Sequence, residues 1–236
     1  MEQMLGVTYP FPDLQVVEVN EWGWGQAPPG MIFITKEALL SHASSAMLNE
    51  DDQPIAERVS RGINERIAHE VAHAWFPHVA KNFTAEDNWL SESFAEYTSA
   101  VCVQRASADK GKGNYFFNRS LSRWKTMTGQ TTDIESIYLA SHLGWREADR
   151  REWQSLLYGK GPLVLHALRQ ELARASGNEE EGDRLFFTWL RSYFKNFTYK
   201  MGGTRHLVAI LTQMTGRDWQ PWFERYVYGT ETPKVN

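Results

Sequence analysis

The sequence predicts an α+β domain that is predominantly helical, with a small β-containing portion at the N-terminus. Hydrophobic residues make up 42% and aromatic residues 13% of the 236 residues, which favours a packed globular protein and excludes a disordered chain. β-branched residues gather in short runs before residue 35, whereas apolar residues recur at helical spacing afterwards. We therefore expect a single domain over residues 1–236. In it, about residues 1–35 contain the strands and residues 36–236 are mainly helical.

Two short strands are predicted in the N-terminal portion. Residues 14–19 read Leu-Gln-Val-Val-Glu-Val, and β-branched residues favour an extended backbone. A loop rich in Gly, Pro and Trp covers residues 21–30, and the apolar run from Met31 to Ile34 then forms a second strand. Thr35 follows and could cap a helix that runs to about residue 48, because its hydroxyl can accept a backbone N–H.

The most regular helical pattern follows Pro54, a residue that suits the first turn of a helix. Apolar residues then recur on one helical face that should pack against the core: Ile55, Val59, Ile63, Ile67 and Val71. The helix should stop before Pro77, because the residue before a proline disfavours helical backbone angles. After a polar turn, a second helix is expected from Asp87 or Asn88 to about Arg105.

The C-terminal half is predicted to consist of helices that end at glycines, since glycine readily adopts the left-handed angles of a helix C-terminus. A flexible loop is expected over residues 107–114, and short helical pieces joined by loops over 131–151. His166 lies in an apolar helix and is expected to be a core residue rather than a ligand. The other predicted helices cover residues 115–127, the apolar segment that ends near Gly177, residues 179–196, residues 204–215 and a last segment capped by Asp218.

The sequence His69-Glu70-Val71-Ala72-His73 lies near the end of the helix that follows Pro54. Two histidines four positions apart share one face of a helix, so their imidazoles can reach a single metal ion. Glu70 lies one step around the helix, close enough to contact a metal-bound water without being a ligand. Zinc in hydrolytic sites takes three protein ligands, so a third must come from elsewhere in the chain.

The candidate for the third ligand is Glu92, which follows His73 after an intervening stretch of eighteen residues. A second helix packed antiparallel to the first would present its carboxylate to the same ion. Glu96 lies one turn further along the same face, where it could hold the free N–H of a ligand histidine or stand on the surface. The alternative for the whole pattern is a solvated helix with two ordinary polar histidines.

These segments resemble the catalytic core of the aminopeptidase N-like gluzincin metallopeptidases. The resemblance is carried by the HExxH helix, the spacing to Glu92 and the segment Trp89-Leu90-Ser91-Glu92-Ser93-Phe94-Ala95. The family usually reads Trp-Leu-Asn-Glu-Gly-Phe-Ala here, so Ser91 and Ser93 replace residues that flank the ligand. The resemblance implies a thermolysin-like catalytic domain with zinc held by His69, His73 and Glu92. It also implies that the chain could be a fragment of a longer protein.

A second segment, Tyr158-Gly159-Lys160-Gly161, is similar to the Tyr-Xaa-Lys-Gly segment of the same family. By this resemblance, Tyr158 would donate a phenol hydrogen bond to the negative charge that develops on the substrate carbonyl oxygen. One such donor is worth on the order of a hundred- to thousandfold in rate. The alternative is a tyrosine of the core or rim that precedes a glycine-rich turn.

One motif of the family is missing from the sequence. In the family, a Gly-Xaa-Met-Glu-Asn motif precedes the second strand, and its glutamate binds the free amino group of the substrate. In register with Gly30-Met31-Ile32, this chain has Ala27 at the position of that glutamate, and Glu18 and Glu21 are the alternative candidates for its role. Whether the substrate must have a free amino end therefore stays open.

The sequence thus predicts a zinc-dependent metallopeptidase that is aminopeptidase-like. Glu70 would act as the general base for the zinc-bound water, and Tyr158 would be the second catalytic residue. Two alternatives remain: an endopeptidase or broader peptidase without amino-terminal recognition, and a non-catalytic domain that keeps the fold as a scaffold. The predicted cofactor is Zn²⁺, and the predicted partner is a peptide substrate, with further domains of a longer chain as an additional expectation.

Composition excludes several other classes. The formal net charge of −4 gives no reason to expect nucleic acid as a partner. No apolar run is long enough to span a membrane, and the N-terminus lacks the pattern of a signal peptide, which favours a soluble protein. Cys102 is the single cysteine, so no intramolecular disulfide can form. We expect it to be a buried thiol, compatible with a reducing compartment such as the cytoplasm.

Overall fold

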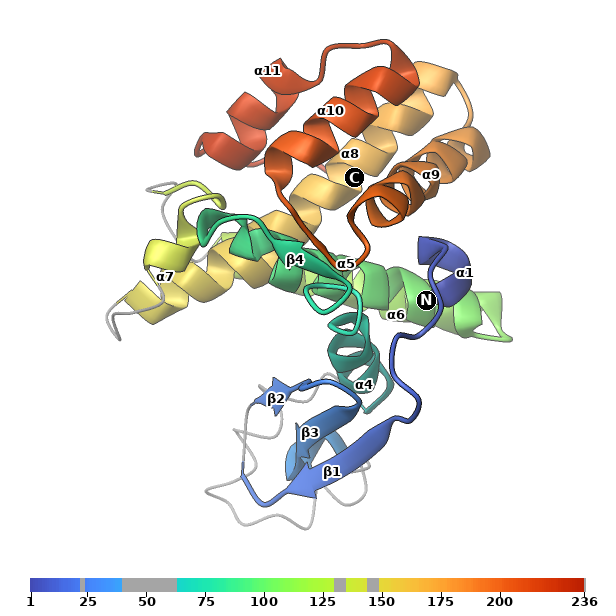
Figure 1. Cartoon of the computed structure of the whole chain (residues 1–236), viewed down its shortest axis with the longest axis vertical. Helices are drawn as coiled ribbons and strands as arrows, with labels where there is room; N and C mark the ends of the chain where they lie inside the picture. The colour runs from blue at the N-terminus through green and yellow to red at the C-terminus, as the bar shows by residue number, and fades with distance from the viewer. Residues whose placement is uncertain (22–23, 40–62, 130–134, 144–148, 236) are drawn as a thin grey trace.

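The computed structural model of the chain describes residues 1–21, 24–39, 63–129, 135–143 and 149–235. The described part is mostly helical and contains two small sheets, which confirms the predicted fold class. Figure 1 shows a three-stranded sheet at one end of the molecule and a group of C-terminal helices at the other. Helix α4 (Ile63–Ala72) contacts strand β3 of that sheet and also contacts α5 (Trp89–Ala106). The N-terminal β portion is therefore joined to the helical part through α4.

The sheet has the strand order β1-β3-β2. Strand β1 (Gln15–Val19) pairs in parallel with β3 (Met31–Thr35), and β2 (Gly25–Gln26) pairs antiparallel with the other side of β3. Both predicted strands are thus confirmed. The predicted loop between them contains β2, which the sequence did not reveal because glycine and glutamine have low strand propensity.

Helix α4 packs its apolar face on this sheet. Ile32 and Ile34 of β3 are 1% and 0% exposed, and Ile67 and Val71 pack against them. This confirms part of the predicted helical stripe. The earlier part of that helix, including Ile55 and Val59, and most of the helix predicted up to residue 48 lie outside the described residues.

From Trp89 to Val101, every residue of α5 except Glu92 is buried, whereas the last residues of the helix are partly or fully exposed. Its start is fixed by the buried Asp87, whose Oδ1 accepts hydrogen bonds of 2.7 Å from both the backbone N–H and the hydroxyl of Thr204. The indole of Trp89 also donates to the Thr204 hydroxyl, at 2.9 Å. Because Glu92 lies in the first turn of α5, these contacts fix where its carboxylate can lie.

Of the remaining helices, α6 (Lys110–Thr128) and α8 (Gly161–Ser176) pack directly against α5. Helix α6 begins at Lys110, so the prediction of a flexible loop over residues 107–114 was wrong for its last five positions. The reason is that the carboxylate of Asp109 caps the helix by accepting from the N–H groups of Gly111 and Lys112. The helices are α6 (Lys110–Thr128), α7 (Arg150–Ser155), α8 (Gly161–Ser176), α9 (Glu179–Phe197), α10 (Thr204–Thr215) and α11 (Gln220–Phe223).

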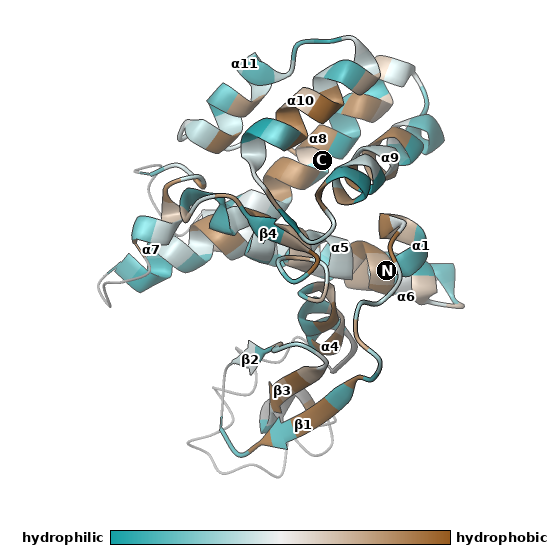
Figure 2. Cartoon of the chain, viewed as in Figure 1, coloured by the Kyte–Doolittle hydropathy of each residue, from teal (hydrophilic) through white to brown (hydrophobic). Residues whose placement is uncertain are grey.

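Short elements complete the fold. Helix α1 (Glu2–Leu5) contributes Met4 and Leu5 to the main hydrophobic core. Strands β4 (Ala80–Asn82) and β5 (Lys200–Gly202) form a two-stranded parallel sheet. Figure 2 shows hydrophobic and hydrophilic residues alternating along α8 and α10, as expected for helices with one face in the core. No helix within the described residues is long and apolar enough to cross a membrane.

His166 on α8 is a partly buried residue of the core, as predicted. Its Nδ1 lies 3.2 Å from the hydroxyl of Tyr97, and its ring lies 5.3 Å from that of Phe117. Burial disfavours the charged imidazolium, and together with the charges of Arg169 and Lys125 it lowers the pKa of His166 to about 4. Between about pH 4 and pH 6.5, His166 is therefore neutral in the folded state but protonated in the unfolded chain.

His166 should make the protein less stable in acid. Between pH 6.5 and about 4 the unfolded chain binds a proton that the folded chain excludes, so stability falls as the pH falls through this window. Full loss corresponds to about 3 kcal/mol. We expect His166→Gln to show a smaller drop in the free energy of unfolding between pH 7.5 and 4.5, by about 2 kcal/mol, in denaturant titrations. His142→Gln, on the surface, is the control. An equal drop in the wild type and His166→Gln would contradict the expectation.

Candidate functional site

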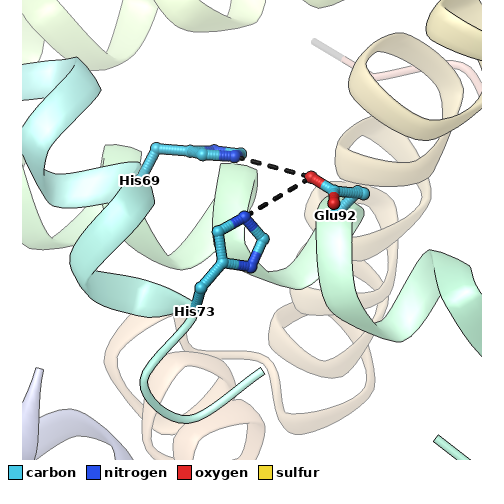
Figure 3. A group of neighbouring side chains, drawn as sticks. All are labelled: His69, His73 and Glu92. Carbon is cyan, nitrogen blue, oxygen red and sulfur yellow. Dashed lines mark ion pairs between the residues drawn. The ribbon is translucent and has the colours of Figure 1, made fainter. Parts of the chain in front are cut away.

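Three candidate ligand atoms meet between α4 and α5. His69 lies on α4, His73 follows directly after its last residue, and Glu92 lies in the first turn of α5. Figure 3 shows both imidazoles pointing toward the carboxylate of Glu92. The Oε2 atom of Glu92 lies 3.6 Å from Nε2 of His69 and 3.5 Å from Nε2 of His73. Ligand atoms of the three residues all lie within 4.8 Å of one another.

These separations fit a tetrahedral metal ion. Zinc binds histidine nitrogen and carboxylate oxygen at about 2.0–2.2 Å, so neighbouring ligand atoms of a tetrahedral site lie roughly 3.3–3.6 Å apart. The two distances to Glu92 match that range. Two imidazole nitrogens and one carboxylate oxygen are also donors that zinc accepts in hydrolytic sites. His69, His73 and Glu92 could therefore hold a zinc ion together.

The other nitrogen of each histidine has its own neighbour. Nδ1 of His73 lies 2.7 Å from the carbonyl oxygen of Phe76, which also accepts a hydrogen bond from the Ser91 hydroxyl at 3.2 Å. Nδ1 of His69 lies 3.0 Å from Oε2 of Glu96. A carbonyl or carboxylate oxygen at Nδ1 favours the tautomer with its proton there. In the neutral form of each ring, Nε2 is then left with a lone pair that faces Glu92.

Glu96 is a buried charge with several partners. It is 2% exposed, and its Oε1 accepts hydrogen bonds from the guanidinium of Arg123 and, at 2.8 Å, from the indole of Trp124. A buried carboxylate is costly unless such donors satisfy it. Helix α6, which carries Arg123 and Trp124, therefore supports the orientation of His69 indirectly.

The carboxylates also set the charge of the site. Burial opposes the charged form of His69, but Glu92 and Glu96 outweigh burial and raise the pKa of His69 to about 9. Burial alone would raise the pKa of Glu92, yet the two histidines hold it well below its usual range. A metal ion at this site would compete with the proton on His69, so its binding would release that proton.

Glu70 lies beside the ligand cluster and under strand β2. Glu70 is 7% exposed. A methyl group on Gly25 would overlap the carboxylate of Glu70, so only glycine lets β2 approach this closely. The sequence identified Glu70 but not Gly25, although a glycine between tryptophan and glutamine in a loop was a signal of a close backbone approach.

Tyr158 lies in a five-residue π-helical turn, Leu156–Lys160, directly before α8. Its hydroxyl donates a hydrogen bond of 2.7 Å to Oε2 of Glu92. The turn is fixed to α5 by Ser93, whose buried hydroxyl donates to the carbonyl of Leu157 at 2.8 Å. A side chain at Gly161 would collide with Ser93, so this contact depends on a glycine there.

The structure thus brings all six predicted site residues together: His69, Glu70, His73, Glu92, Glu96 and Tyr158. Five of them line one cleft of about 650 Å³, and Glu96 lies behind it. Ala27 also lines the cleft. Glu18 does not, because β1 lies at the edge of the sheet opposite to β2. Glu21 does not line it either, and its carboxylate accepts a hydrogen bond from Trp24 at 2.6 Å.

Sequence reasoning missed most of the cleft wall. The described lining contains four arginines, which carry no recognisable spacing in the sequence because they come from three different helices. They are Arg66, Arg119, Arg123 and Arg150. Among the described residues that line the cleft, Glu70 and Glu92 are the carboxylates.

Comparisons with known proteins agree with the resemblance seen in the sequence. The model of the Peptidase family M1 domain matches residues 1–226. Aminopeptidase N of Lactococcus lactis is 28% identical over 229 residues, which is 95% of this chain and 23% of that protein. Aminopeptidase N of Streptomyces lividans is 27% identical over 173 residues, which is 72% of this chain and 18% of that protein.

Solved structures show the same fold. An M1 zinc metallopeptidase from Deinococcus radiodurans superposes with a TM-score of 0.65 at 21% sequence identity, covering 99% of this chain and 43% of that one. The chain therefore spans less than half of that structure and less than a quarter of the two curated relatives.

Removing the charge of Glu96 should weaken metal binding without removing a ligand. We expect Glu96→Gln to lower the affinity for Zn²⁺ about tenfold to a hundredfold, the usual cost of losing a group that orients a ligand histidine. Affinity is measured by competition with a chelating dye, and thermal unfolding is followed alongside because Glu96 is buried. Glu171→Gln, which changes a surface ion pair, is the control. An unchanged zinc affinity in Glu96→Gln would show that Glu96 does not orient His69.

Proposed function

The chain belongs to peptidase family M1, and on that premise we propose that it is a zinc-dependent metallopeptidase that hydrolyses peptide bonds. One observation carries the proposal: the Nε2 atoms of His69 and His73 converge on Oε2 of Glu92, with Glu70 beside them. We further propose that residues 1–236 act as one catalytic domain, because the cleft is built jointly by the N-terminal sheet and the helices. This complete set of side chains argues against a domain kept only as a scaffold.

Each residue of the site has a distinct role in the proposed reaction. Zinc held by His69, His73 and Glu92 would supply a Lewis acid that polarises the peptide carbonyl and lowers the pKa of water to about 7. Glu70 would take a proton from the attacking water and deliver it to the leaving amine. The phenol of Tyr158 would donate a hydrogen bond to the carbonyl oxygen as negative charge develops on it.

The relatives support an aminopeptidase, but the cleft itself supports a second candidate. An aminopeptidase needs an acidic group for the charged amino end of its substrate, and Ala27 occupies the position where the family has that group. Within the described lining, both carboxylates, Glu70 and Glu92, already have other roles. An endopeptidase or broader peptidase would not need a further carboxylate. Comparing peptides with free and N-acetylated amino ends distinguishes the two candidates.

The general base can be tested by Glu70→Gln. This variant keeps the three ligands, so we expect a normal zinc content, while kcat falls by at least about a hundredfold because the proton acceptor is lost. The substrates are a peptide library with free and N-acetylated amino ends, and the product termini are identified by mass spectrometry.

Glu18→Gln, on the far edge of the sheet, is the matched control and should cleave like the wild type. Wild-type rates in Glu70→Gln would remove Glu70 from the mechanism. Failure of the zinc-loaded wild type to cleave any peptide in the library would reject the peptidase proposal.

The role of Tyr158 can be separated from metal binding. Tyr158→Phe removes only the hydroxyl, so we expect kcat to fall about a hundred- to thousandfold while KM and zinc content change little. Steady-state kinetics and metal analysis on the same preparation provide the measurement. Tyr138→Phe, outside the cleft lining, is the control for loss of a phenol. An unchanged kcat in Tyr158→Phe would assign this residue to packing alone.

A further inference from the structure

We propose that the cleft selects substrates that carry a carboxylate, bound by the guanidinium groups of Arg119 and Arg150. This inference rests on the proposed peptidase function and specifies its substrate class. The carboxylate could belong to an aspartate or glutamate side chain or to the free carboxyl end of a short peptide. Both sources present the same planar group, which arginine matches with its fork of N–H donors.

The charge of the cleft is opposite to that of the whole chain. The chain has a formal net charge of −4, yet four arginines and two carboxylates line the described part of the cleft. Both carboxylates belong to the catalytic group, one as ligand and one as base. A bound divalent cation would make this surface more positive still. Within the described lining, this balance of charge favours an anionic substrate group over a cationic one.

The four arginines differ in how far they are exposed. Arg123 forms an ion pair with Glu96, which balances its charge. Arg66 is 5% exposed and donates hydrogen bonds to the carbonyl of Trp24 and the hydroxyl of Thr35, so it ties α4 to the sheet. Arg119 and Arg150 are the exposed members of the set. Within the described lining, these two arginines are therefore the most accessible to a substrate in the cleft.

Helical spacing places both arginines on one wall. On α6, Arg119, Arg123 and Met127 follow one another at intervals of four residues and all line the cleft. On α7, the lining residues are Arg150, Trp153 and Gln154, which again share one helical face. The two helices are in contact. Their lining faces therefore form a continuous wall.

The two ends of this wall differ in character: one end is apolar and the other carries the arginines. Its apolar end lies at the catalytic group, because the ring of Trp153 is 5.7 Å from that of Tyr158 and Met127 contacts the turn that carries Tyr158. Arg119 lies two turns before Met127 on α6, about 12 Å along the helix axis at 1.5 Å per residue. A peptide bound at Tyr158 would thus place a neighbouring residue or its carboxyl end toward the arginines.

The test uses matched peptides and matched variants of the 236-residue chain. In a first series of peptide pairs, the two members differ only by glutamate or glutamine at one position, and each position is tested in turn. In a further pair, the two members differ only by a free or an amidated carboxyl end. The Arg119→Gln/Arg150→Gln double variant removes both exposed charges, and Arg150→Lys keeps the charge without the fork. Arg151→Gln is the matched control, since Arg151 is the exposed next residue of α7 but does not line the cleft.

Two readouts are needed. Calorimetric titration of the metal-free chain measures peptide binding without catalysis, and kcat/KM of the zinc-loaded chain measures selection during turnover. Each exposed guanidinium–carboxylate pair is worth up to about fivefold in affinity, and two arginines contribute, so we expect the wild type to prefer one acidic twin by about fivefold to tenfold. The double variant should abolish this preference, Arg150→Lys should keep part of it, and Arg151→Gln should keep all of it. Raising the salt concentration should reduce it, because exposed charges are screened.

The outcomes separate the two sources of the carboxylate and the two proposals. A preference confined to the glutamate pairs indicates a side chain, and one confined to the free carboxyl end indicates a terminus. If the wild type binds both peptides of every pair equally, or if the preference survives in the double variant, Arg119 and Arg150 do not select a carboxylate. Cleavage of any peptide would still support the peptidase proposal in that case. Selective binding without cleavage of any peptide supports the wall and rejects the peptidase.

Discussion

The structure depends on the contact of α4 with α5, because this contact brings side chains from two helices to one point. Neither helix alone supplies three ligands. Ile67 and Val71 fix α4 against the sheet, and the hydrogen bonds between Asp87 and Thr204 fix the first turn of α5. The ligand atoms of His69, His73 and Glu92 then lie close enough for one small cation. A displacement of about 1 Å at either end would change those distances enough to weaken a metal that tolerates little variation in bond length.

Burial of charge explains why α6 packs where it does. The proposed site concentrates carboxylates and imidazoles in a largely enclosed place, and each buried charge needs a partner. Glu96 meets His69 on one side and Arg123 with Trp124 on the other, so α6 must pack against α5 at this position. The same face of α6 continues to Arg119 at the cleft. One helix therefore serves both the inner contacts of the proposed metal site and the proposed recognition of substrate.

The features that were predicted correctly from the sequence are those that depend on the spacing of residues along one helix or strand. The spacing of His69 and His73 needs only the geometry of one helix, and the buried run around Glu92 marks another. The missed features all depend on contacts between distant segments. Strand β2 exists because β3 pairs with it, and Gly25 is required by Glu70, forty-five positions later. The role of Ser93 needs the turn after α7. The start of α6 was the exception, since Asp109 was a local cap signal that the loop prediction overlooked.

Two positions in and directly after strand β2, Gly25 and Ala27, face different demands: one adjoins the proposed general base and the other lines the cleft where a substrate would bind. Gly25 lies against the carboxylate of Glu70, and a Cβ atom at this position would overlap that carboxylate, so the position is constrained by packing. Ala27 follows β2, lines the same cleft and packs half-buried against Ile32 and Ile34, and its carbonyl oxygen lies 2.7 Å from Nε2 of His78. Gly25 is thus tied to the proposed general base, whereas the side chain at position 27 lies where it would influence which substrate the cleft accepts. If position 27 is where the family has its acidic group, as the register with Gly30 predicts, the proposed arginines on the facing helices would set a different preference without altering the residues proposed to break the bond.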